Sequence, residues 1–180
     1  MAKRLITLVC VLALALGAAA TDAKDFVTLL IEQAEAESEE SAKDYEYTQI
    51  GPSMIALMKQ MVDSSAGDKL SDEEREAMTR LLSQISSICI FRTTSRHDFY
   101  YGLAKGLVEA QGETYEDLAT RNGANGSDGV WCRRDSENIT ELFAINYEEG
   151  TALNIVGFTG DIDKDLLTTL MDVAKERIAK

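Results

Sequence analysis

One stretch near the N-terminus starts apolar and becomes acidic, and the spacing of its apolar side chains predicts a helix. In residues 25–42, "DFVTLLIEQAEAESEESA", Phe26, Leu29 and Leu30 fall on one helical face. After the first turns, alanine is the only apolar residue left in the stretch. We therefore predict a helix followed by a solvated acidic segment over residues 21–44. The acidic run is more typical of a soluble face than of a ligand site.

A strand and a second helix are predicted next. "YEYTQI", residues 45–50, is rich in aromatic and β-branched side chains, which favour a strand, and Gly51-Pro52 ends it. Ser53 is the predicted cap of the helix that follows. One face of that helix carries Met54, Leu57, Met58 and Met61. A methionine stripe is compatible with a soft-metal site or a peptide groove. Because the spacing is helical and no histidine or cysteine accompanies it, we interpret the stripe as core packing.

Capping residues and apolar periodicity predict two further helices. Ser71 and Glu74 form a capping-box pattern, and Ser95 is the predicted cap of the later helix. The inward faces are predicted to carry Met78, Leu81, Leu82 and Ile85 in the first helix and Phe99, Leu103, Leu107 and Ala110 in the second. The chain closes with another predicted helix, which is rich in leucine at helical spacing.

The remaining segments predict strands. "SSICIFRT" is mostly apolar on both faces and is predicted to lie inside a sheet. "YEDLAT", "VWCRRD", "ITELFAINYE" and "ALNIVGFTG" are predicted as four more strands, of which the last three are antiparallel. Together with the helices they predict one α+β domain over residues 45–180. Its expected architecture is an antiparallel-rich sheet with helices packed on one face, a split, ferredoxin-like sandwich.

The first residues of the chain have the pattern of an export signal. Lys3 and Arg4 precede an apolar run over residues 5–16 that contains one threonine, and three alanines follow at 18–20. The run is short for a membrane-spanning helix, which needs about 20 apolar residues. We predict a secretory signal peptide over residues 1–20 and a secreted or periplasmic protein. Cys10 lies inside the apolar run and does not resemble a lipoprotein acceptor.

Charge narrows the classes of partner. Two of the 18 basic residues and none of the 31 acidic ones lie in the predicted signal, so its removal would change the formal net charge from −13 to −15. Such a surface repels nucleic acid and anionic membrane. No integral membrane span is expected after signal cleavage.

Two cysteines lie beyond the predicted signal, Cys89 and Cys132. Export would place them in an oxidising compartment, where a disulfide between them would contribute about 4 kcal/mol in the chain-entropy model. Both lie in predicted strands, where a cysteine is often a small buried apolar residue. A disulfide and two buried thiols both stay open, because bridging requires a narrow Cα separation.

Four segments, taken in order, resemble a bacterial protein family. They are "YTQIGPSMIALM", "ISSICIFRT", "ELFAIN" and "VGFTGDIDKDLLTTL". In this order and spacing they resemble small secreted proteins and lipoproteins that are catalogued as domain of unknown function 4252, over about residues 25–178. The resemblance implies a cell-envelope location and supplies no catalytic residues. Many members carry a lipoprotein cysteine after the signal, and this chain lacks one, so membrane anchoring is not carried over.

Asp161, Asp163 and Asp165 alternate just before the last predicted helix, and this spacing has two interpretations. A calcium loop of the helix-loop-helix type needs glycine at position 6 and glutamate at position 12, but counting from Asp161 these are Leu166 and Asp172. A helix start accounts for the same residues, because Asp161 or Asp163 would cap the helix and the other carboxylates would face its positive end. We favour the helix start and retain a calcium-binding module as an alternative function.

His97 is the only histidine of the chain. This excludes histidine-rich zinc sites and leaves one imidazole as a general base. A pair with Cys89 or Cys132 would give a thiol-active envelope enzyme. However, His97 lies in the first turn of a predicted helix, and no third group that would orient such a pair is identifiable. We expect no catalytic residue, no metal site and no cofactor.

Four arginines stand out in this acidic chain: Arg92, Arg96, Arg133 and Arg134. If the strands that carry them are neighbours, the four would form a patch for a small anionic ligand. The alternative is that they form ordinary surface pairs with carboxylates. The function we expect is that of an exported cell-envelope protein that binds an unknown protein or small ligand and is not an enzyme. The thiol-active enzyme and the calcium-binding module remain the alternatives.

Overall fold

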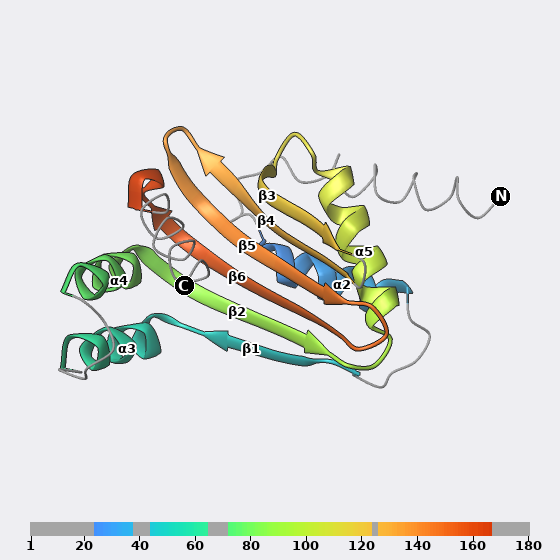
Figure 1. Ribbon diagram of the computed structural model, residues 1–180, viewed down its shortest axis with the longest axis horizontal. Helices are drawn as coiled ribbons and strands as arrows, with labels where there is room; N and C mark the ends of the chain where they lie inside the picture. Colours follow the sequence, from blue (N-terminus) through green and yellow to red (C-terminus); the bar gives the residue numbers. More distant parts are fainter. Residues whose placement is uncertain (1–23, 38–43, 65–71, 124–125, 167–180) are drawn as a thin grey trace.

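The chain folds into one antiparallel sheet with helices on both of its faces (Figure 1). The structure, a computed structural model, describes residues 24–37, 44–64, 72–123 and 126–166. Its strands are β1 (Glu46–Ile50), β2 (Ile85–Thr93), β3 (Glu116–Gly123), β4 (Gly126–Asp135), β5 (Asn138–Glu148) and β6 (Ala152–Ile162). Its helices are α2 (Phe26–Glu37), α3 (Pro52–Ser64), α4 (Asp72–Gln84) and α5 (His97–Ala110), and a further helix begins at Lys164. The predicted signal over residues 1–20 lies outside the described residues.

The strands lie in the order β1-β2-β6-β5-β4-β3, and every neighbouring pair is antiparallel. Strands β3 to β6 follow one another in sequence, and β6 then pairs with the earlier strand β2. β1 and β3 are the two edges of the sheet. The predicted α+β class and the predicted antiparallel sheet are confirmed, and each predicted strand is present.

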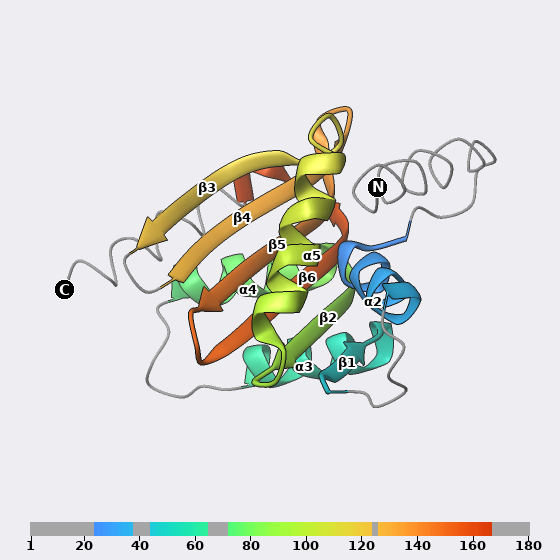
Figure 2. The same cartoon turned by 90° about the vertical axis from the view of Figure 1, so that its right-hand side faces the viewer.

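One face of the sheet is covered by α2 and α5 (Figure 2). The core between them is aromatic and aliphatic, and the rings of Phe26 and Phe143 stack with their centroids 4.0 Å apart. Phe26 and Leu30 of α2 and Phe91 of β2 are completely buried. Because α2 supplies part of this core, the helix predicted ahead of residue 45 is a structural layer of the same domain.

A second, smaller core lies on the opposite face, toward one end of the sheet. Its buried residues are Ile55, Leu82, Ile85, Ile88, Cys132, Ile139 and Ile162. They come from α3 and α4, which pack on each other, and from the strands beside them. Helices were predicted on one face of the sheet, and α2 and α5 occupy that position. The α3–α4 pair adds a partial layer of helices on the other face.

The methionine stripe predicted to lie in the core is largely exposed. Met54, Leu57 and Met61 are 52%, 48% and 58% exposed. Helix α3 instead turns Ile55, Met58 and Val62 toward the core. The prediction of core packing is therefore wrong for three of its four residues. Both sets follow helical spacing, so periodicity could not tell which of the two faces is buried.

Two predicted helix caps are also replaced by other residues. α3 begins at Pro52, and the carbonyl of Gly51 accepts hydrogen bonds from the amides of Met54 and Ile55, so Ser53 is not its cap. At α5 the cap position is Arg96, in a left-handed conformation with φ 50°, rather than Ser95. The amide of Ser95 donates to Thr93 Oγ1 (3.1 Å). The predicted cap Ser71 lies outside the described residues.

Candidate functional site

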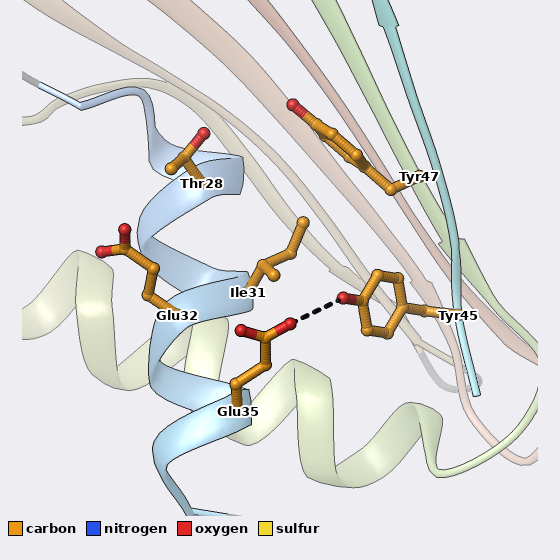
Figure 3. A pocket seen from close by; sticks show the side chains of 6 residues that line it. All are labelled: Thr28, Ile31, Glu32, Glu35, Tyr45 and Tyr47. Carbon is orange, nitrogen blue, oxygen red and sulfur yellow. Dashed lines mark hydrogen bonds between the residues drawn. The ribbon is translucent and has the colours of Figure 1, made fainter. Parts of the chain in front are cut away.

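A groove lies between α2 and the edge strand β1. It encloses about 560 Å³ and is lined by Thr28, Ile31, Glu32, Glu35, Tyr45 and Tyr47. Figure 3 shows the two tyrosines extending from the β1 side toward the helix, while the other four side chains project from α2. The groove thus joins aromatic rings on one wall to carboxylates and an apolar side chain on the other.

The position of α2 follows from its sequence. Asp25 caps the helix, because the amide of Thr28 donates to Asp25 Oδ1 (2.9 Å) and the Thr28 hydroxyl donates to Asp25 Oδ2 (2.8 Å). Phe26 and Leu30 are buried against the sheet. The groove-lining residues lie on an adjacent face of the helix, at spacings of three and four residues.

A buried carboxylate fastens the start of α2 to the middle of the sheet. Glu141 of β5 is 1% exposed, and its Oε1 accepts a hydrogen bond from the amide of Phe26 (2.5 Å). Its Oε2 accepts one from the hydroxyl of Tyr115 (3.2 Å) and lies 3.2 Å from Arg133 Nη2. Burial raises the pKa of Glu141, while the Phe26 amide and the Arg133 guanidinium oppose that rise. These contacts hold one wall of the groove in place.

The electrostatics of the groove are set by its two glutamates. Glu32 pairs with Lys24 at 2.6 Å, and Glu35 Oε1 accepts a hydrogen bond from the hydroxyl of Tyr45 (3.5 Å). Burial, followed by the charge of Glu35, raises the pKa of Tyr45, so this phenol keeps its proton. A ligand with an apolar part and a cationic group matches the rings and carboxylates of such a groove.

Cys89 lies beneath the tyrosine wall. Its Sγ is 3.6 Å from the hydroxyl of Tyr47 and 3.8 Å from Ser87 Oγ, and the residue is 1% exposed. Burial is the largest cause that raises the pKa of this thiol, and it also raises the pKa of Tyr47. A buried thiol with a raised pKa is a poor nucleophile.

Cys132 lies on the other face of the sheet and belongs to the smaller core, whereas Cys89 belongs to the larger one. Both cysteines are free. Two strands separate β2 from β4, which places the cysteines about 14 Å apart, since neighbouring strands lie about 4.8 Å apart. A disulfide requires Cα atoms within about 7 Å. Of the two possibilities that the sequence left open, the disulfide is therefore wrong and the two buried thiols are observed.

The four arginines do not gather. β6 and β5 lie between the strand of Arg92 and the strand of Arg133 and Arg134, so the condition for a shared patch is not met. Arg133 contacts the buried Glu141, and Arg134 Nε donates to Glu116 Oε2 (2.6 Å). Arg96 Nε lies 3.7 Å from Asp44 Oδ2, and its guanidinium lies 4.2 Å from the centroid of the Phe99 ring. Arg92 is exposed and lies opposite Glu46 across the β1–β2 pair.

Two of the three alternating aspartates, Asp161 and Asp163, make separate contacts. Asp163 caps the helix that begins at Lys164, because its Oδ1 accepts from the amide of Asp165 (2.8 Å). Backbone amides of the new helix are the first cause that lowers the pKa of Asp163, and Arg80 adds to it at 2.6 Å. Asp161 accepts a hydrogen bond from Asn138 instead. The predicted helix start is confirmed, and no metal-ligand cluster is found in the part of the chain that the structure describes.

His97 is the first residue of α5, and its side chain is 16% exposed. Its Nε2 lies 3.4 Å from Asp98 Oδ1, and Asp98 accepts a hydrogen bond from the hydroxyl of Tyr147 (2.5 Å). Neither ring nitrogen has a hydrogen-bond partner among the described residues. No Cys–His pair is therefore formed within the described structure.

Sequence reasoning found the tyrosines as strand residues and the glutamates as part of an acidic run, but it did not bring the two together. It also missed Glu141. The available signal was a single charged residue at a position where the β5 alternation calls for an apolar one, between Ile139 and Phe143. No described helix combines the length and the hydropathy that a membrane crossing would need.

Comparison with known proteins agrees with the resemblance noted in the sequence. The model of one family, described as domain of unknown function DUF4252, matches residues 40–170. Neither the curated proteins nor the solved structures contain a match. The matched region includes all six strands and the tyrosine wall of the groove, and it begins after the helix that forms the other wall. The chain belongs to the DUF4252 family.

Proposed function

We propose that this protein is an exported, non-enzymatic binding module of the bacterial cell envelope, and that its ligand occupies the groove between α2 and β1. The observation that carries the proposal is that Tyr45 and Tyr47 of the β1 side face Ile31 and Glu35 of α2 across one hollow beside a well-packed sheet. Mixed apolar and polar linings of this kind are typical of ligand sites.

Two further features support a binding role over catalysis. Cys89, whose Sγ contacts the hydroxyl of Tyr47, is buried and has a raised pKa. His97 contacts Asp98 rather than a thiol. Nucleophilic catalysis needs the nucleophile and its base within hydrogen-bond reach of each other. Export is supported by the N-terminal sequence pattern, because a basic start, an apolar run and small residues are typical of a secretory signal.

The binding role is tested by NMR on the chain without residues 1–20. Amide spectra are recorded while separate solutions of amines, guanidines, carboxylic acids, sugars and aromatic compounds are added. We expect at least one class to shift the resonances of residues 28–35 together with those of Tyr45 and Tyr47. Shifts that leave these residues unchanged and cluster elsewhere would contradict the groove as the site.

A thiol-active enzyme is the second candidate, favoured by the closeness of Cys89 to the groove. It is tested by titrating thiols in the native and the unfolded protein with a thiol reagent. The binding-module proposal expects both thiols to react far more slowly in the native than in the unfolded protein, because both are buried. A thiol that reacts in the native protein, together with thiol-exchange activity that a Cys89→Ser substitution abolishes, would favour the enzyme.

Export is tested by expression of the full chain in a Gram-negative host, followed by fractionation and mass spectrometry. We expect the product in the periplasmic or secreted fraction, shortened by the 20 residues up to Ala20. Uncleaved protein that stays in the cytoplasm would contradict this part of the proposal.

A further inference from the structure

The two edges of the sheet differ in their protection against a further strand. β3 carries Glu116, Asp117 and Arg121, and its register shifts between Asp117 and Ala119. Charges and bulges of this kind discourage strand addition. β1 carries one charged side chain, Glu46, and pairs with β2 in an unbroken register. Among the described strands, β2 pairs with one edge of β1 and none pairs with the other.

The groove adjoins this unprotected edge. Tyr47 lies within β1, and Tyr45 immediately precedes it. Both rings extend toward α2, where Glu35 points at Tyr45, whereas Glu32 projects away from the two tyrosines (Figure 3). A long side chain that entered from a strand added to β1 would pass along the tyrosine rings before it reached the carboxylate of Glu35. The ring of Tyr45 is fixed by stacking on Phe91, with centroids 5.1 Å apart.

The charge on the α2 wall favours a cation. The last turn of α2 contains Glu35, which lines the groove, and no basic residue. Glu32 is paired with Lys24, but both side chains are about half exposed. An exposed pair of this kind contributes little stability, and Glu35 is the carboxylate that faces the tyrosines.

We propose that β1 accepts an added strand from a partner polypeptide, and that a lysine or arginine of this strand places its cationic group in the groove. Main-chain hydrogen bonds to the free edge of β1 would supply affinity, and the groove would select the basic residue. Tyr45 and Tyr47 would contact the side chain through their ring faces, and Glu35 would pair with its charge. This inference rests on the proposed function, because it takes the groove as the ligand site.

The free edge is the reason to favour a polypeptide over a small cation. A small amine or guanidine could fill the groove, but it would leave the edge of β1 unpaired. A peptide uses both features at once.

The test uses a fluorescent seven-residue peptide of alternating valine and threonine with a central lysine, and the chain without residues 1–20. The fluorescence anisotropy of the peptide, recorded at low salt as the protein is added, measures the binding. A peptide with a central glutamate is the first control, and we expect it to bind at least about tenfold more weakly. Two further versions of the lysine peptide are N-methylated at alternate residues. Each version therefore lacks the amide hydrogens along one of the two edges of the extended peptide. Only one of them should lose binding, because an added strand pairs through a single edge.

Substitutions in the protein locate the basic residue. Glu35→Gln should weaken binding of the lysine peptide by about threefold, as expected for a partly exposed charge contact, and Glu32→Gln should weaken it less. Glu37→Gln is the matched control, because it removes the same charge from the same helix at a residue that does not line the groove. Its affinity for the peptide should not change. Equal effects of all three substitutions would show a general charge effect and would overturn the assignment to the groove.

Arginine amide, added in the NMR experiment, separates this inference from the proposed function. If it shifts the groove resonances while both N-methylated peptides bind equally well, strand addition is overturned and the groove remains a binding site. If neither the lysine peptide nor arginine amide perturbs the groove, a cationic ligand is overturned. The proposed function would then depend on the other compound classes of its own test.

Discussion

At the scale of single residues, the carboxylate of Glu141 joins three elements through one buried group. It accepts from the first amide of α2 and from Tyr115, and it faces Arg133 of the neighbouring strand. A buried charge is costly without partners, and the loss of one member of a buried pair leaves the other uncompensated. The position of α2 thus depends on a residue that lies more than a hundred positions later in the sequence.

Replacement of Glu141 with alanine should lower the free energy of unfolding by about 3 kcal/mol or more, because it leaves the Arg133 guanidinium and two buried donors without an acceptor. Urea denaturation followed by circular dichroism measures the loss. Glu116→Ala is the matched control, since Glu116 pairs with Arg134 on the same strand as Arg133 but is 56% exposed. The control should cost less than about 1 kcal/mol. Similar losses for the two variants would show that the buried contacts of Glu141 stabilise the fold no more than an exposed ion pair does.

Glu141 also makes a specific contribution to the pH dependence of stability. Burial raises its pKa in the folded protein, so above the ordinary glutamate range the folded state holds a proton that the unfolded chain has released. The contribution of Glu141 to the free energy of unfolding is fully present below its ordinary pKa in the unfolded chain. This contribution is lost as pH rises through the raised pKa of the folded protein. The unfolding free energy of the wild type minus that of Glu141→Gln should therefore fall as pH increases above about 4. Urea titrations at several pH values measure this difference, and a rise with pH would refute the expectation.

At the scale of elements, local pattern predicted the type of each segment better than the face that it buries. The alternation in β5 and the apolar run of β2 indicated strands, and both are present. Helix α3 carries two stripes at helical spacing, one with Ile55 and one with Met54. Which stripe is buried depends on where α4 and the sheet lie, and local spacing holds no information about that. The groove could not be predicted for the same reason, because Tyr45 and Tyr47 come close to α2 only through tertiary packing.

The helix that begins at Lys164 gives a test at this scale. Asp163→Ala should lower the free energy of unfolding by about 1 kcal/mol, because Asp163 caps the helix and contacts Arg80. Asp161→Ala should cost less, since Asp161 contacts the side chain of Asn138 and not the helix amides. Thermal melts of both variants, with and without millimolar calcium, measure the difference. A melting temperature of the wild type that rises with calcium would revive the calcium-binding alternative.

At the scale of the whole molecule, the order of the strands and the place of α2 decide the architecture. The sequence predicted the strands without their order, because pairing between β2 and β6 depends on residues far apart along the chain. The predicted domain began at residue 45, and the family match begins at residue 40. The structure nevertheless places Phe26, Val27 and Leu30 in the larger core with exposures of 1% or less.

Removal of α2 should therefore prevent stable folding. A chain of residues 44–180 would expose the larger core along the path of α2 and would leave Glu141 without the Phe26 amide. We expect poorly dispersed NMR spectra and loss of a cooperative urea transition relative to the chain of residues 21–180. A chain of residues 24–180 is the control and should fold normally. Cooperative unfolding of the 44–180 chain with unchanged stability would show that α2 is an accessory element.

The two free cysteines lie in separate cores on opposite sides of the same sheet. Each thiol is therefore a natural reporter of one layer, Cys89 for the layer under α2 and α5 and Cys132 for the layer beside α3 and α4. If the layers open independently below the global transition, the two sulfurs will be alkylated at different rates in the native protein. The sheet would then act as a partition between two cooperative units, and a ligand that joins α2 to β1 would slow labelling on one side of it only.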